Sequence, residues 1–208
     1  MTRNFVHFVV RNWIVFIGVW LVGCATVPEV PQLSPIAQPS VESAARIRSF
    51  QLSGRVGVKY DENGFFGNVR WQHDAQSDEI LILSPLGQGV AQISQNGAGV
   101  TLITSNQQTY HAQDAETLTE EVLGWRLPLN GLRDWVLGRK TAGDAQIKLD
   151  QSGRLSRLIQ DGWQIDYLNY QELNGATLPQ KLTMQRGNLE MKLIIDNWDI
   201  TQSNTMAP

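Results

Sequence analysis

The stretch Leu189-Glu-Met-Lys-Leu-Ile-Ile195 contains the clearest alternation of apolar and other side chains in the sequence. Successive side chains of a β-strand point to opposite faces of its sheet, so a period of two is typical of a strand with one buried face. We therefore expect a strand over residues 189–198. Its buried face would carry the residues Leu189, Met191, Leu193 and Ile195.

The same period recurs along most of the chain. Residues 50–60 alternate in this way, and Asp61-Glu-Asn-Gly64 predicts a turn into a second strand over residues 65–71. Short turns such as Asn96-Gly97 favour antiparallel pairing. The prediction is about eleven strands, the others lying at residues 79–83, 89–94, 100–104, 109–112, 146–149, 154–160, 162–170 and 180–186.

Two helical segments interrupt these strands. Asp114 is a candidate N-cap for a helix over residues 115–124. Pro128 opens a second segment, in which apolar residues recur at three- and four-residue spacing as far as Gly138. Because an antiparallel sheet of this size has to curl or close, we predict a mainly β fold. It would be a curved, partly open antiparallel barrel with a helix pair covering an apolar cavity.

The N-terminus has the composition of an export signal. Basic residues, among them Arg3 and Arg11, precede a ten-residue apolar run at residues 13–22, which ends in Leu21-Val22-Gly23-Cys24. At about 1.5 Å rise per residue, this run is too short for a permanent membrane span. Leu-Val-Gly-Cys resembles a bacterial lipobox, which implies cleavage before Cys24 and a diacylglycerol and an N-acyl chain on that residue. The alternative is a buried N-terminal helix that happens to end in the only cysteine.

A tether is expected after this signal. Residues 24–40 hold Cys24 and four of the eight prolines, a composition typical of an extended linker. Ala25 stands where lipoproteins retained in the inner membrane have Asp, so the resemblance implies lipid anchoring in the outer membrane, facing the periplasm. A short helix is expected at residues 41–48, within a domain over residues 41–208.

Charge and motif content exclude several classes of function. Removal of residues 1–23 takes away two Arg and no acidic residue, which leaves 15 Lys and Arg against 20 Asp and Glu. A net charge near −5 without a basic cluster argues against nucleic-acid binding. The three scattered His and the absence of an H-E-x-x-H, G-x-S-x-G or P-loop motif argue against an enzyme or a metal site. Asp114 and Glu116 are expected to be a helix cap and a first-turn acid rather than a catalytic pair.

Several short blocks mark the mature sequence: Phe50-Gln-Leu-Ser-Gly-Arg-Val56, Trp71, Leu83-Ser-Pro-Leu-Gly87, Asp114-Ala-Glu116, Leu123-Gly-Trp125, Leu127-Pro-Leu129, Leu132-Arg-Asp-Trp135, Leu137-Gly138 and Asn197-Trp198. Their order and spacing resemble the LolB family of outer-membrane lipoprotein receptors. That family has a curved, eleven-stranded sheet and helices around an apolar cavity. The resemblance implies a monomer that accepts lipoproteins from a LolA-like periplasmic carrier and binds their acyl chains. It would insert them into the outer membrane without a cofactor or nucleotide hydrolysis.

Two candidate sites accompany this hypothesis. An acyl cavity is expected between the first two strands and the helix pair, lined by Leu52, Val56, Val58, Val69, Trp71, Trp125 and Trp135. Pro85 and Gly87 favour a sharp turn with Leu86 at its tip. The resemblance implies that this leucine is exposed and helps to place lipoproteins in the membrane.

The alternatives at both sites are structural, namely an ordinary filled core and a Leu86 that folds back onto it. Two other functions also stay open. One is a structural outer-membrane lipoprotein that binds protein partners only, and the other is a lipid-modifying enzyme.

Overall fold

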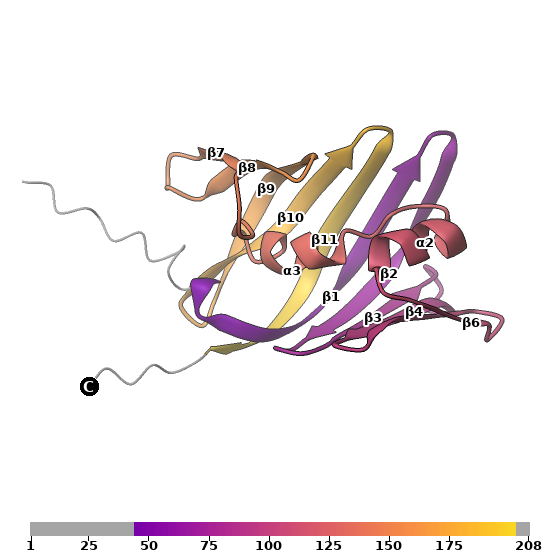
Figure 1. Ribbon diagram of the computed structural model, residues 1–208. Helices are drawn as coiled ribbons and strands as arrows, with labels where there is room; N and C mark the ends of the chain where they lie inside the picture. The colour runs from indigo at the N-terminus through magenta and orange to yellow at the C-terminus, as the bar shows by residue number, and fades with distance from the viewer. Residues whose placement is uncertain (1–43, 203–208) are drawn as a thin grey trace, which may run out of the picture. The chain divides into compact units, whose positions relative to one another are not determined.

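The computed structural model describes residues 44–202, and the structural statements below refer to this part of the chain. The predicted signal peptide (1–23) and the tether with Cys24 (24–40) lie outside it. The described residues form a single antiparallel sheet of eleven strands with the helices α2 and α3 (Figure 1). The helices are α2 (Ala115–Leu123) and α3 (Leu129–Trp135), and the strands are β1 (Ile47–Tyr60), β2 (Asn63–His73), β3 (Asp78–Leu83), β4 (Gly89–Asn96), β5 (Gly99–Thr104), β6 (Thr109–Ala112), β7 (Gln146–Leu149), β8 (Leu155–Gln160), β9 (Trp163–Leu173), β10 (Ala176–Arg186) and β11 (Leu189–Gln202).

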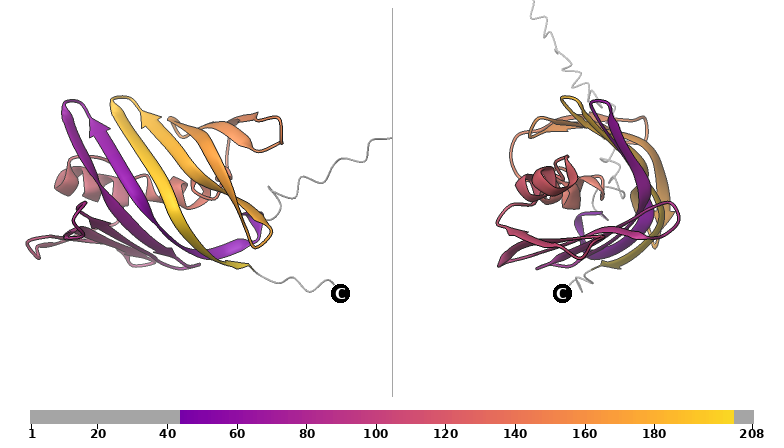
Figure 2. Two further views of the ribbon diagram at one scale, coloured as in Figure 1. Left: turned by 180° about the vertical axis from the view of Figure 1, so that it is seen from behind. Right: turned by 90° about the vertical axis from the view of Figure 1, so that its right-hand side faces the viewer.

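The sheet is curved and open. Its strand order is β6-β5-β4-β3-β2-β1-β11-β10-β9-β8-β7, so β1 pairs with β11, and the edge strands β6 and β7 do not pair with each other. Figure 2 shows that the sheet curls around the two helices, which lie on its concave side. The predicted fold class is therefore confirmed.

Close approach of the backbones at the centre of the sheet depends on a glycine. A Cβ atom at Gly54 of β1 would lie 2.1 Å from the carbonyl oxygen of Ile194 on β11. The β1–β11 register also shifts between Ser53 and Gly54. Such a bulge bends a strand and increases its twist, so it contributes to the curvature that the cavity needs.

The core lies between the concave face and the helices. Leu52 of β1 pairs with Trp71 of β2 on one side and with Trp198 of β11 on the other. The alternation in residues 189–195 predicts the buried face of β11 correctly. The four residues assigned to that face, Leu189, Met191, Leu193 and Ile195, are all buried.

Some predicted boundaries are wrong. The helix expected at residues 41–48 does not extend to its end, because β1 begins at Ile47, which pairs with Gln202 of β11 and is buried. Strand pairing outweighs local helix propensity at this position. The second predicted helix ends at Trp135 rather than near Gly138. The first turn is also shorter than predicted, since Asn63 already pairs with Tyr60.

Candidate functional site

An apolar cavity of about 40 Å³ lies between the concave face of the sheet and the helical segment. Among residues 44–202, every residue that lines the cavity is apolar. The lining comes from five strands, from α3 and from the α2–α3 connection: Leu52, Val56, Val69, Trp71, Ile80, Ile82, Trp125, Leu127, Leu132, Met184, Met191 and Leu193.

The structure places five of the seven predicted lining residues around this cavity: Leu52, Val56, Val69, Trp71 and Trp125. The other two are buried but do not line it. Val58 lies two residues closer to the β1–β2 turn. Trp135 lies at the far end of α3, over β8 and β9, where its ring centroid is 6.2 Å from that of Trp163.

The remaining lining residues are not among the predicted ones, although some of them carry a usable sequence signal. Met191 and Leu193 belong to the clearest alternation of the chain, and Ile80 and Ile82 share one face of a predicted strand. Met184 faces Met191 across the β10–β11 pair. Its position depends on that register, which a single sequence does not reveal.

A larger hollow of about 460 Å³ borders the same strands and shares the lining residues Leu52, Trp71 and Ile80 with the apolar cavity. Many of its lining side chains are polar and belong to the outer face of the sheet, among them Gln51, Arg70, Gln72, Glu79 and Gln92. It is broad and open to solvent. Of the two, only the smaller cavity has the apolar, enclosed character that suits a hydrocarbon ligand.

The capping and the termination of α2 position the α2–α3 connection beside the cavity. Asp114 caps α2 as predicted: its Oδ2 atom accepts a hydrogen bond from the Thr117 N–H (2.7 Å), which lowers the pKa of Asp114. The helix ends at Gly124, which adopts a left-handed conformation (φ 80°). The buried Thr119 hydroxyl then accepts from the Leu127 N–H (2.9 Å) and fixes the connection.

A buried ion pair attaches α3 to the sheet beside the cavity. Asp78 of β3 is fully buried, and its Oδ2 atom lies 2.5 Å from the guanidinium of Arg133 on α3. This contact is an ion pair rather than an aligned hydrogen bond. The other oxygen of Asp78 accepts from Trp71 Nε1 (2.8 Å) and lies 2.9 Å from His73 Nδ1. The His73–Asp78 contact thus belongs to a structural network.

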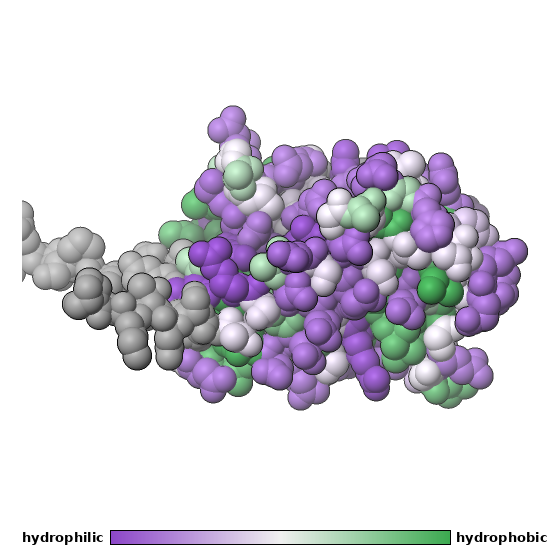
Figure 3. Space-filling view, turned by 60° about the horizontal axis from the view of Figure 1, so that its bottom comes forward, coloured by the Kyte–Doolittle hydropathy of each residue, from purple (hydrophilic) through white to green (hydrophobic). Residues whose placement is uncertain are grey.

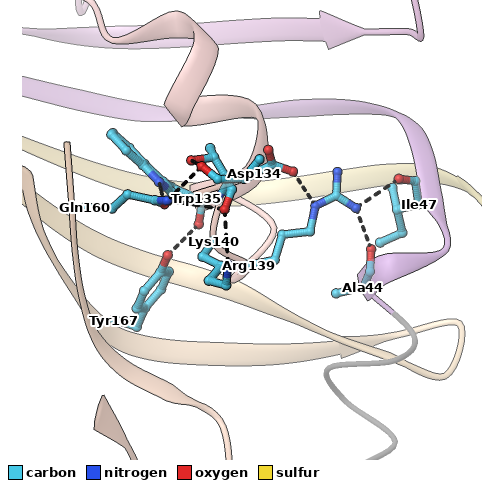
Figure 4. A network of polar contacts seen from close by, with 10 residues as sticks. Ala44, Ile47, Asp134, Trp135, Arg139, Lys140, Gln160 and Tyr167 are labelled. Atoms are coloured by element: carbon cyan, nitrogen blue, oxygen red, sulfur yellow. Dashed lines mark hydrogen bonds and ion pairs between the residues drawn. The ribbon is translucent and has the colours of Figure 1, made fainter. Parts of the chain in front are cut away.

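The C-terminal end of α3 is held by a second polar network (Figure 4). Arg139 donates to Asp134 (2.6 Å) and to the carbonyl oxygens of Ala44 and Ile47, at the start of β1. The Tyr167 hydroxyl of β9 donates to the carbonyl oxygen of Trp135 (3.0 Å). Burial raises the pKa of Tyr167 well above its ordinary value, so the hydroxyl keeps the proton that it donates.

The ion pair that joins α2 to the sheet is more exposed than the Asp78–Arg133 pair. Glu116 lies 3.3 Å from Arg186 at the end of β10, and both side chains are substantially exposed. Exposed ion pairs contribute about 0–1 kcal/mol to stability, whereas breaking a buried pair costs about 3–5 kcal/mol. Of the two ion pairs that join a helix to the sheet, the Glu116–Arg186 pair of α2 therefore costs less to break than the Asp78–Arg133 pair of α3.

We expect Asp78→Ala to lower the free energy of unfolding by about 3 kcal/mol, because the buried Trp71 Nε1 would lose its acceptor and the partly exposed guanidinium of Arg133 its partner. Urea unfolding measures this change. The matched control is Asp196→Ala, which removes the exposed Arg55–Asp196 pair on the outer face and is expected to cost less than about 1 kcal/mol. Equal losses in the two variants would contradict the assignment of Asp78 as an internal anchor.

Leu86 lies in the loop between β3 and β4. The Gly87 N–H donates to the Ser84 carbonyl oxygen (2.9 Å), and Gly87 has a positive φ of 85°, so the chain turns sharply around Pro85 and Leu86. The Leu86 side chain is 90% exposed. The loop therefore holds this side chain in solvent, as the resemblance to the LolB family implies.

The described residues contain no group of His, Cys, Asp and Glu side chains that could hold a metal ion. Neither α2 nor α3 has the length and apolar composition needed to cross a membrane.

Comparisons with known proteins agree on one family. The family model described as "Outer membrane lipoprotein LolB" matches residues 48–198. An outer-membrane lipoprotein LolB of Nitrosomonas europaea is 43% identical over 195 residues, which cover 90% of this chain and 92% of the relative. A second, from Thiobacillus denitrificans, is 40% identical and covers 85% of this chain and 90% of its own length.

One solved structure has a similar fold. It is a DUF1329 family protein from Desulfovibrio piger, with a TM-score of 0.50 and 5% sequence identity. The match covers 80% of this chain and 90% of that chain. At this level of identity the likeness concerns the fold alone.

Proposed function

The chain belongs to the LolB family of outer-membrane lipoproteins, and we propose that it accepts lipoproteins from a periplasmic carrier and inserts them into the outer membrane. The observation that carries this function is the enclosed cavity with a wholly apolar lining. The acyl chains of the cargo would bind there. Cys24 would carry the lipid anchor, and no cofactor is needed.

The cavity has to enlarge before it can hold an acyl chain. Its volume of about 40 Å³ has room for no more than a few water molecules, each of which needs about 10–15 Å³ of such space. Pockets for larger ligands occupy roughly 300–1,000 Å³. The structure therefore corresponds to a closed state, in which core side chains fill the space that the acyl chain would occupy.

Opening at α2 follows from the unequal anchoring of the helices. Separation of Glu116 from Arg186 breaks an exposed ion pair, whereas displacement of α3 would expose the buried carboxylate of Asp78. Movement of α2 and the Trp125–Leu127 connection would open the cavity on the side of this pair. Met184 and Met191 add flexible side chains that can repack around a ligand.

Energetics favour direct transfer between binding sites. Burial of each methylene contributes about 0.8 kcal/mol, so one acyl chain contributes roughly 10 kcal/mol. Release of the chain into water would be very slow at that cost. Contact from carrier to receptor to bilayer avoids this barrier, and no fuel is needed if each site binds the chain more tightly than the one before it.

An apolar fluorescent probe tests this function. We expect the probe to bind the protein and to be displaced by a purified lipoprotein delivered from its carrier. A structural lipoprotein with a permanently filled core would bind neither the probe nor the acyl chains. Failure of both to bind, with the carrier and cargo intact, would contradict the proposal.

A further inference from the structure

The tether joins the domain at the end of the sheet opposite to Leu86. The described part of the chain begins at Ala44, and β1 runs from Ile47 to Tyr60, where the turn at Asp61 follows. β2 is antiparallel to β1, and β3 is antiparallel to β2, so β3 runs in the same direction as β1, toward the β1–β2 turn. The β3–β4 loop with Leu86 therefore lies at the β1–β2 turn end of the sheet.

A second exposed apolar residue, Phe66, lies beside this loop. It is next to Gly67 on β2, where a Cβ atom would lie 2.1 Å from the carbonyl oxygen of Leu83. The side-chain amide of Asn68 donates to the Ser84 carbonyl oxygen (3.3 Å). These contacts hold the first residues of the loop against the segment of β2 that carries Phe66.

Phe66 is on the outer face of the sheet. Its neighbour Phe65 packs against the core, and strand alternation places Phe66 on the opposite face, where its side chain is 64% exposed. Phe66 pairs with Gly57 of β1, and the space above Gly57 is open. Figure 3 shows a largely hydrophilic surface on which hydrophobic residues form several small patches.

We propose that Phe66 and Leu86 form one membrane-contact surface and that this end of the sheet faces the lipid of the outer membrane. The proposal rests on the proposed function, and it adds a second contact residue and the orientation of the domain. Exposed large apolar side chains that lie close together mark contact surfaces. Phenylalanine and leucine have the chemistry that a lipid surface binds.

The position of Phe66 favours lipid over the carrier as its partner. In the proposed function, acyl chains would enter from the concave side of the sheet, where the cavity lies. Phe66 faces away from that side. Because Phe66 lies on the outer face, beside the loop, it can contact lipid while the cavity holds an acyl chain.

The tether is long enough for this orientation. Leu83 pairs at the level of Arg55, eight residues after the start of β1, so at about 3.3 Å per residue the loop begins roughly 26 Å from that start and its tip lies at most about 36 Å from it. Residues 25–43 can span roughly 60 Å at about 3.1 Å per residue. The anchor and the far end of the sheet can therefore reach the same membrane.

Spin labels in the full mature lipoprotein, reconstituted in phospholipid vesicles, test the orientation. The anchor blocks Cys24, so Phe66→Cys, Leu86→Cys and Leu168→Cys each carry a single label. Leu168 is half exposed on β9 and serves as the control. We expect the labels at 66 and 86 to be accessible to oxygen and shielded from a polar nickel complex, and the label at 168 to remain in water.

The outcomes separate this inference from the proposed function. If the label at position 66 were in water and the label at position 86 in lipid, Phe66 would have no membrane role. The proposed function would not be affected by that result. A label in water at both positions would contradict the membrane role of the loop as well. Lipid contact at 168 equal to that at 66 would show an unspecific orientation and would also overturn the proposal.

Two variants give an independent readout. Phe66→Gln is expected to slow lipoprotein insertion about tenfold, and Leu168→Gln to leave it unchanged. Deletion of residues 29–40 leaves a tether of roughly 20 Å, which is too short to bring the far end of the sheet to the membrane. It is expected to move the label at 66 into water. Normal insertion by Phe66→Gln, or lipid contact at 66 with the short tether, would contradict the proposal.

Discussion

Leu86→Glu is expected to reduce insertion of lipoproteins into the outer membrane by at least tenfold and to leave the fold and the capture of cargo intact. The side chain is 90% exposed, so its replacement removes little packing and should change the free energy of unfolding by less than about 0.5 kcal/mol. In contact with lipid, a leucine contributes about 1.5–3 kcal/mol. A carboxylate at the same place loses this contribution and resists desolvation.

Two assays separate the steps that Leu86 affects. Transfer from the carrier to the protein reports capture, and transfer from the protein to liposomes reports insertion. Leu86→Met is the conservative control and should insert cargo normally, because it keeps an apolar side chain at the loop tip. Normal insertion by Leu86→Glu, or an equal loss of insertion in Leu168→Glu on β9, would show that the leucine has no special role.

A reversible cross-link between α2 and β10 is expected to abolish acyl-chain binding, and reduction of the cross-link to restore it. Glu116 of α2 lies 3.3 Å from Arg186 at the end of β10. Cysteines at these two positions, joined by a short reducible bis-maleimide linker, would hold α2 in the closed state. Because the closed cavity has a volume of about 40 Å³, it excludes an acyl chain.

The control cross-link joins strands that are already paired. Arg55 and Asp196 lie 2.8 Å apart on the outer face, on β1 and β11, and a linker between them does not cross the cavity. In the chain with Cys24 replaced by Ala, no other cysteine competes for the linker. Full binding of the probe and the cargo by the Glu116–Arg186 cross-linked form would show that α2 is not the part that moves.

Much of the fold follows from local patterns. Period-two alternation predicts every strand, and the Asp114 cap predicts the start of α2, because these features depend on residues close together in the chain. The curvature of the sheet depends partly on the close approach of Gly54 to Ile194. Because Gly54 and Ile194 are far apart in the sequence, no local pattern predicts this contact.

The site is less predictable than the fold. Leu52, Val56, Val69, Trp71 and Trp125 line the cavity as predicted, but alternation selects Val58 equally well, although it packs beyond the cavity. Helical spacing selects Trp135 in the same way. The Asp78–Arg133 pair joins residues that meet only because α3 crosses β3, and the sequence contains no sign of it.

Quenching of tryptophan fluorescence by cargo with brominated acyl chains tests the central claim most directly. Trp71 and Trp125 line the cavity, whereas Trp163 packs against Trp135 outside it. We expect transfer from the carrier to quench the emission of the protein, and the Trp71→Phe/Trp125→Phe double variant to lose most of that quenching while still accepting cargo. Insertion of brominated cargo without quenching of Trp71 and Trp125 would contradict the account.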